Sequence, residues 1–103
     1  MAAPTQPRVV YVTGAFRKDL KRAARHRKCN LSELQRVMEA LESRHTLDAK
    51  YLDHALTGRY PDQKGGYTDC RECHTSNDWL LVYRLPDEAG IHFIRCGTHS
   101  ELF

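Results

Sequence analysis

The chain has 103 residues and a net charge of +3, which is enough for one domain and too few for two. No apolar run approaches the roughly 18 residues that a membrane span requires, which argues against a membrane protein. Residues 1–7 lack the basic start and apolar core of a signal peptide, so we expect them to form a loose tail ahead of one domain at residues 8–103. The expected location is therefore the cytoplasm, where cysteines are more often thiols or metal ligands than disulfides.

Residues 8–13 are β-branched and aromatic and predict a first strand. From residue 15 to residue 28, Phe16 and Leu20 begin an apolar stripe at helical spacing, and the other side of this predicted helix is basic. A basic patch on a mildly basic protein indicates a polyanionic partner such as nucleic acid, although a solvated helix face explains the charge equally well. The candidate contacts on this face are Lys18, Lys21, Arg22 and Arg25.

A second helix is predicted from the N-cap Asn30, with Glu33 in the position of a capping box, to about Arg44. Only Cys29 and Asn30 would separate the two helices, so we expect them to form a hairpin. Because the pair alone cannot bury both apolar stripes, a sheet is expected to cover them.

Residues 45–66 have no clear period and are predicted to form a long, partly ordered connection. Three strands are predicted after it, at residues 67–73, 78–85 and 91–96. The second of these is apolar at nearly every position, as expected for a central strand covered on both faces. Short links between the strands imply an antiparallel meander. The predicted fold is α+β, with a two-helix hairpin packed on one face of a mostly antiparallel four-stranded sheet.

The cysteines also match metal-binding patterns. Cys70, Cys73, Cys96 and His99 have the spacing of a Cys3His zinc ribbon, which would make the chain a nucleic-acid-binding module. The run from Cys70 to His74 matches the c-type haem attachment pattern, but nothing in the sequence indicates export. Against zinc, Cys70 and Cys73 would point to opposite faces of an extended strand, and cysteine is a common core residue.

Polar side chains at strand ends and in loops suggest acid–base catalysis on RNA instead. The candidates are His54, His74, Asp78, Arg95 and His99. Cleaving RNA through its own 2′-hydroxyl needs a base for the hydroxyl proton, a cation beside the phosphate and an acid for the departing 5′ oxygen. Two histidines and one arginine supply these groups with no metal or cofactor, and a carboxylate such as Asp78 would orient a histidine. This hypothesis requires the side chains to converge in the fold.

Four motifs, spanning nearly everything after residue 10, carry a family resemblance. They are Phe16-x-Lys18-Asp19-Leu20-Lys21, Asp53-His54-x-Leu56-x-Gly58, His74-x-x-x-Asp78-Trp79-x-Leu81-x-Tyr83 and Arg95-x-Gly97-Thr98-His99-x-x-Leu102-Phe103. With these motifs the chain resembles the YafQ branch of the RelE/ParE toxin superfamily, the bacterial mRNA interferases. The resemblance implies a small toxin that enters the ribosomal A site, cuts mRNA there without metal and is silenced by a cognate antitoxin.

The resemblance also implies roles, carried over by position. His54 would be the general base and His99 the general acid, or the reverse, and Arg95 would hold the scissile phosphate. His74 and Asp78 would shape the proton network. The aromatic residues implied to stack on the substrate or to wall the site are Trp79 and Phe103.

Two other classes of function stay open beside the nuclease. One is the zinc-bound nucleic-acid-binding module, and the other is a toxin of the same fold that only binds a protein target, as ParE-like relatives do. In the last case toxicity would not depend on His99. For any antitoxin we expect an acidic, partly disordered segment that orders on the basic helix and near Arg95.

Overall fold

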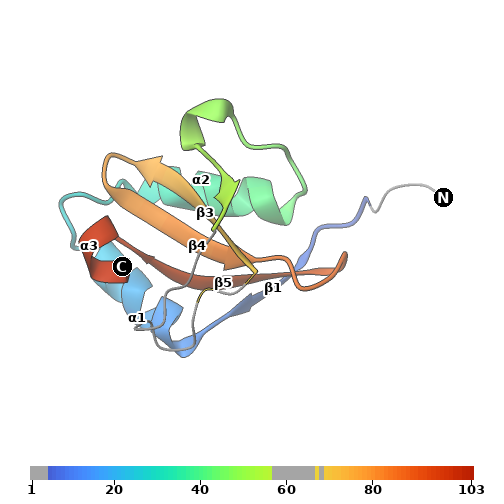
Figure 1. Ribbon diagram of the computed structural model, residues 1–103, viewed down its shortest axis with the longest axis horizontal. Coiled ribbons are helices and arrows are strands. Elements are labelled where there is room, and N and C mark those ends of the chain that lie inside the picture. Colours follow the sequence, from blue (N-terminus) through green and yellow to red (C-terminus); the bar gives the residue numbers. More distant parts are fainter. Residues whose placement is uncertain (1–4, 57–66, 68) are drawn as a thin grey trace.

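The computed structural model describes residues 5–56, 67 and 69–103. The predicted tail at residues 1–7 and the predicted connection at residues 45–66 therefore lie partly outside the described residues. In chain order the elements are β1 (Val9–Val12), α1 (Gly14–Ala23), α2 (Leu31–Glu42), the 3-10 helix η1 (Ala49–Tyr51), β2 (His54–Ala55), β3 (Cys70–Ser76), β4 (Trp79–Arg84), β5 (Gly90–Gly97) and α3 (His99–Leu102) (Figure 1). No helix in this part of the chain is long and apolar enough to cross a membrane.

The strands form one five-stranded sheet in the order β1-β5-β4-β3-β2. Neighbouring strands β2 to β5 pair antiparallel, and β1 pairs with β5 in parallel. The predicted α+β fold, the antiparallel meander and the central strand are confirmed. The predicted strand count of four was one short, because β2 holds only two residues and such a strand has no periodicity to recognise. The strand predicted at residues 67–73 lies instead at β3, Cys70–Ser76.

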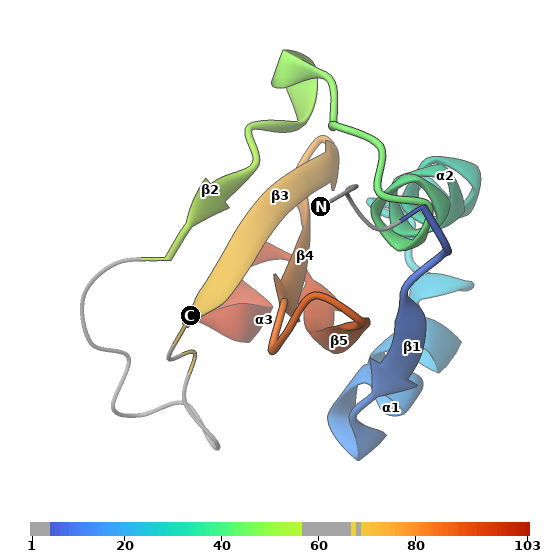
Figure 2. The ribbon, with the colours of Figure 1, turned by 90° about the vertical axis from the view of Figure 1, so that its right-hand side faces the viewer.

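Helices α1 and α2 cover the same face of the sheet, as Figure 2 shows. Side chains of β4 alternate between the two faces, and those directed to the helices are completely or almost completely buried. This helix-side core consists mainly of Phe16, Ala23, Leu34, Val37, Leu41, Trp79, Leu81, Tyr83, Ile91, Phe93, Cys73 and Cys96. Asn30 caps α2, accepting a hydrogen bond from the backbone of Glu33 at 3.1 Å, as the sequence predicted.

Helix α1 ends at Ala23, so the prediction that it runs to residue 28 was wrong. The backbone N–H groups of Arg25 and His26 donate to carbonyls only three residues back, which tightens the chain out of the α-helix. The imidazole of His26 then packs against the buried ring of Trp79, with ring centroids 4.9 Å apart. Residues 24–30 therefore join the helices, in place of the predicted two-residue link.

Helix α3 packs on the other face of the sheet. Leu102 of α3 is fully buried with Leu80 and Val82 of β4. Thr98 and Glu101 form a capping box at the start of α3, each accepting a hydrogen bond from the backbone of the other. The C-terminal segment is thus docked on the sheet.

Candidate active site

The register of the sheet brings three of the predicted catalytic residues to the face that carries α3. His54 is opposite Glu72, Glu72 is opposite Val82, and Val82 is opposite Arg95. Directly opposed residues point to the same face, and Val82 points to the α3 side. His54 and Arg95 therefore stand at the two ends of one row across four strands, with Cα atoms about 14 Å apart from the usual strand spacing.

A second row lies next to the first. His74 is opposite Leu80, and Leu80 is opposite Gly97, two residues before His99. Because Leu80 packs with Leu102 of α3, this row also belongs to the α3 face. The face thus carries His54, His74 and Arg95 on strands, and His99 on the short helix α3 that packs on this face.

The imidazole of His54 has one defined hydrogen bond. Its Nδ1 lies 2.6 Å from the carbonyl oxygen of Leu52, and because a carbonyl only accepts, Nδ1 carries the hydrogen. In the neutral ring the hydrogen is then absent from Nε2, which is left as an acceptor. His54 is exposed, so that Nε2 can reach a substrate hydroxyl.

Glu72 is a carboxylate at the site that was not picked out from the sequence. It is 6% exposed, and its Oε1 lies 3.4 Å from Nε2 of His74, a contact that becomes an ion pair when His74 is protonated. Its two-residue spacing from His74 on a strand was the available signal, since residues i and i+2 share a face.

Asp78 holds the start of α3. Its Oδ1 accepts a hydrogen bond from the backbone N–H of His99 at 3.1 Å, and its Oδ2 lies 3.6 Å from Nζ of Lys28. The hydrogen bond from His99, supported by the charge of Lys28, lowers the pKa of Asp78 below its usual 3.8. The contact therefore orients the His99 backbone rather than its imidazole.

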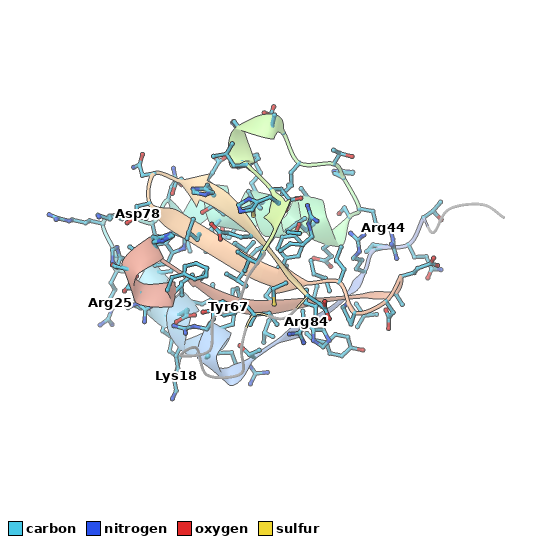
Figure 3. The ribbon with its side chains drawn as sticks, viewed as in Figure 1. Lys18, Arg25, Arg44, Tyr67, Asp78 and Arg84 are labelled. Atoms are coloured by element: carbon cyan, nitrogen blue, oxygen red, sulfur yellow. The ribbon has the colours of Figure 1, made fainter. Side chains whose placement is uncertain are left out.

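Aromatic rings surround the imidazole of His99. The ring of Phe103 lies 5.1 Å from that of His99 and 5.3 Å from that of Tyr67, measured between centroids. The Tyr67 hydroxyl donates to the carbonyl oxygen of Leu102 at 3.1 Å, and burial raises the pKa of this phenol. Figure 3 shows Tyr67 near α3 and Asp78 at the far end of the sheet from Arg44. Phe103 is thus placed directly against His99, where it could wall the candidate site.

Arg95 is held by a buried carboxylate from α1. Its Nε and Nη2 donate to Oδ2 and Oδ1 of Asp19 at 2.7 and 3.2 Å, and this pairing raises the pKa of Arg95. Asp19 is 2% exposed. In the sequence it was named only within the motif that begins at Phe16, with no role of its own. It lies three residues after Phe16 and four before Ala23, on the buried side of α1.

The sequence of the chain is similar to that of known toxins. A sequence model of the YafQ family, described as the bacterial toxin of a type II toxin-antitoxin system, matches residues 8–103. The chain belongs to the YafQ toxin family. It is 35% identical over 97 residues to the mRNA interferase toxin YafQ of Escherichia coli K12, covering 93% of this chain and 96% of that protein.

Solved structures of bacterial toxins agree with this assignment. The toxin in the E. coli DinJ-YafQ toxin-antitoxin complex is 33% identical with a TM-score of 0.77, covering 94% of this chain and 98% of that one. A metal-bound toxin from Helicobacter pylori is 36% identical with a TM-score of 0.74, covering 92% and 98%. The RelE-like fold expected from the motifs is therefore confirmed.

In this YafQ-family chain the four candidate zinc ligands do not come together. Cys70 belongs to the core under α3, whereas Cys73 and Cys96 belong to the helix-side core. Burial raises the pKa of both Cys73 and Cys96 to about 12, so these thiols stay protonated. Among the described residues no three His, Cys, Asp or Glu side chains are placed to share a metal ion. The alternative of a Cys3His zinc site is therefore wrong, because the sheet separates its proposed ligands.

Two predicted substrate contacts have other positions in the structure. Trp79 is 0% exposed in the helix-side core, so its ring cannot stack on a nucleotide there. Arg22 is paired internally, with Nη2 3.1 Å from Oδ1 of Asp19 and Nε 3.2 Å from Oε2 of Glu101. Lys18, Lys21 and Arg25 are exposed, and Figure 3 shows Lys18 and Arg25 at the α1 side of the molecule.

Proposed function

We propose that this chain is an endoribonuclease that cleaves mRNA in the ribosomal A site by metal-independent acid–base catalysis. The observation that carries the proposal is the register of β2, β3, β4 and β5, which aligns His54, His74 and Arg95 on the sheet face against which α3, with His99, packs. A base, a cation and an acid are the groups that RNA cleavage through the 2′-hydroxyl requires. The name of the E. coli relative, an mRNA interferase toxin, supports the same substrate.

In the proposed reaction His54 is the general base. Its Nε2 takes the proton of the 2′-hydroxyl, and the 2′ oxygen attacks the adjacent phosphorus. The hydrogen bond from Nδ1 to Leu52 favours this assignment, because it leaves the Nε2 lone pair directed away from the backbone. General base catalysis of this kind typically contributes 10²–10⁴-fold.

Arg95 and His99 complete the reaction. The Arg95 guanidinium stabilises the charge that builds up on the phosphate oxygens. His99, against Phe103, gives a proton to the departing 5′ oxygen, and the products are a 2′,3′-cyclic phosphate and a 5′-hydroxyl end. His74, beside the buried Glu72, adds a second positive charge near the phosphate when it is protonated. In this scheme Asp78 acts on the acid indirectly, through the His99 backbone.

The proposed site of action is the ribosome. Lys18, Lys21 and Arg25 are exposed, so they are available to ribosomal RNA phosphates. Binding through such contacts weakens steeply as salt is raised.

The proposed regulator is a cognate antitoxin. The E. coli YafQ toxin is solved in complex with an antitoxin, DinJ. We expect the partner of this chain to carry an acidic segment that orders on the basic surface of α1 and near Arg95. An affinity that is unchanged between low and high salt would show that charge is not the main attraction.

The proposal is tested by mapping new 5′ ends of mRNA in translation reactions. Wild type and His99→Ala are compared, each with actively translating ribosomes and with naked mRNA. The expected result is cleavage at A-site codons by the wild type on ribosomes only, and its loss in the variant. Cleavage of naked mRNA would reject the ribosome requirement. Absence of any cleavage by folded wild type would favour a toxin that acts by binding a protein.

A further inference from the structure

We propose that Asp19 is a positioning residue for the reaction, which acts by orienting Arg95 and, through Arg22, the helix that carries His99. This inference rests on the proposed nuclease function. Asp19 lies on α1 and does not reach the substrate face itself, because its carboxylate is buried and occupied by donors of the protein.

The carboxylate of Asp19 is saturated with donors from three sides. Oδ2 accepts from Nε of Arg95 at 2.7 Å and from the backbone N–H of Cys96 at 3.0 Å. Oδ1 accepts from Nη2 of Arg95 at 3.2 Å and from Nη2 of Arg22 at 3.1 Å. A buried carboxylate that accepts four such hydrogen bonds is held in one orientation, and it fixes the plane of the Arg95 guanidinium in turn.

The contact with Cys96 explains why an acid is needed at this point of the sheet. The parallel partner of β5 ends at Val12, which is opposite Phe93, so Cys96 lies beyond the last residue of β1. Asp19 from α1 replaces the missing strand as the acceptor for this buried N–H group. The same side chain therefore finishes the edge of the sheet and holds the arginine that precedes Cys96.

The geometry also restricts how a phosphate can reach Arg95. Nε and one side of Nη2 are bound to Asp19, so these donors are not available to a phosphate. An unrestrained arginine has several rotamers over the face, whereas Asp19 selects one. A misplacement of about 1 Å at a reacting group can cost roughly 10²-fold in rate.

A second arm runs from Asp19 to α3. Arg22 bridges Oδ1 of Asp19 and Oε2 of Glu101, and Oε1 of Glu101 accepts from the backbone N–H of Thr98 at 2.8 Å. Helix α3 has only four residues, too few to be stable without such contacts. Arg22 thus acts between α1 and α3 rather than on RNA, and it links the carboxylate that orients Arg95 to the helix of His99.

The test is a double-mutant cycle in single-turnover cleavage on ribosome–mRNA complexes at saturating toxin. The variants are Asp19→Asn, Arg95→Ala, the double variant and Arg22→Gln, with Glu39→Gln, an exposed carboxylate of α2, as the matched control. Asp19→Asn is nearly isosteric but presents an amide to the donors, and we expect a loss of about 100-fold, while Glu39→Gln cleaves as the wild type does.

The decisive comparison is between the double variant and Arg95→Ala. If Asp19 acts through Arg95, the Asp19→Asn change has little left to disturb once Arg95 is already alanine. The extra loss of cleavage rate in the double variant is then no larger than the loss caused by Arg22→Gln alone, because only the contact to α3 remains to be broken. A purely structural role predicts that the full loss from Asp19→Asn multiplies that from Arg95→Ala, and this result would overturn the proposal.

Two controls distinguish a failure of this proposal from misfolding of a variant and from a failure of the proposed nuclease function. Circular dichroism at the assay temperature checks each variant, and if Asp19→Asn is unfolded the cycle is repeated with Asp19→Glu, which keeps the charge but moves the carboxylate by about 1.5 Å. A folded wild type that does not cleave rejects the nuclease function. A wild type that cleaves no faster than folded Asp19→Asn rejects only the role of Asp19.

Discussion

The imidazole of His54 donates its Nδ1 hydrogen to the carbonyl oxygen of Leu52, two residues earlier in the chain, at 2.6 Å. Leu52 has a φ of 53°, in the left-handed region that residues such as leucine rarely adopt, and the residue is 58% exposed. This turn directs the Leu52 carbonyl to the imidazole that follows it. A strained backbone residue and the tautomer of the proposed base are therefore linked, and such strain is typical of functional sites.

Replacement of His54 tests its proposed role as the general base. His54→Gln removes the Nε2 acceptor from an exposed position, so we expect single-turnover cleavage to fall by about 10²-fold or more while the melting temperature barely changes. The control is His45→Gln, an exposed histidine away from the two rows. Equal cleavage by His54→Gln and His45→Gln would remove His54 from the mechanism.

The attachment of α3 is expected to depend on pH. Hydrogen bonding to His99 lowers the pKa of Asp78, and although burial acts to raise the pKa of Glu101, hydrogen bonds from Thr98 and the charge of Arg22 lower it overall. A depressed folded-state pKa stabilises the fold above the unfolded values, 3.8 and 4.5 here, and this contribution is lost as the pH falls through the folded values.

We therefore expect hydrogen-exchange protection of the Leu102 and Phe103 amides to fall below about pH 4, before that of Leu81 in β4. The double substitution Asp78→Asn and Glu101→Gln is expected to lower it already at pH 7. Protection of α3 that follows β4 at every pH would contradict these roles of the two carboxylates.

The reactivity of the thiols tests the conclusion that the cysteines do not form a zinc site. Burial raises the pKa of all four cysteines, but only Cys29 is partly exposed, whereas Cys70, Cys73 and Cys96 are at most 1% exposed. We expect a thiol reagent at pH 8 to modify Cys29 alone in the folded protein and all four after unfolding. A zinc ribbon predicts instead about one zinc per purified chain, and it predicts that Cys70→Ser unfolds the domain. The structure predicts that Cys70→Ser has only a mild effect on stability.

Trp79 is expected to affect stability rather than substrate binding. Its ring is completely buried against His26, so Trp79→Ala should cost about 3–5 kcal/mol of unfolding free energy. Trp79→Phe retains a ring in the core and is expected to cleave at the wild-type rate at temperatures where it is folded. If Trp79→Phe is fully folded but cleaves much more slowly, the indole contributes directly to the site.

The sequence predicted the parts of this fold that depend on local patterns. The apolar run of β4 indicated a strand covered on both faces, and Asn30 indicated the start of α2, because alternation and capping are decided by residues close in the chain. Helix α1 was predicted too long because residues 24–28 favour a helix, whereas the packing of His26 on Trp79, far apart in sequence, ends it earlier.

The site was predictable as a set of residues but not as an arrangement. His54, His74, Arg95 and His99 were named, yet their common face follows from strand register, and β2 is too short to be recognised in sequence. Arg22 was assigned to a basic surface and Asp19 was given no role. Only the packing of α1 against β5 shows that Asp19 is buried on Arg95 and that Arg22 joins it to Glu101.

The central claim is that the groups on this face cleave RNA through its own 2′-hydroxyl. The most direct measurement uses ribosomes carrying an mRNA with a single 2′-deoxynucleotide at the A-site position that is cut in the all-ribose message. We predict that the all-ribose mRNA yields a 2′,3′-cyclic phosphate end and that the deoxy-substituted mRNA is not cut at that position. Cleavage of the deoxy-substituted mRNA there at a comparable rate would contradict the mechanism.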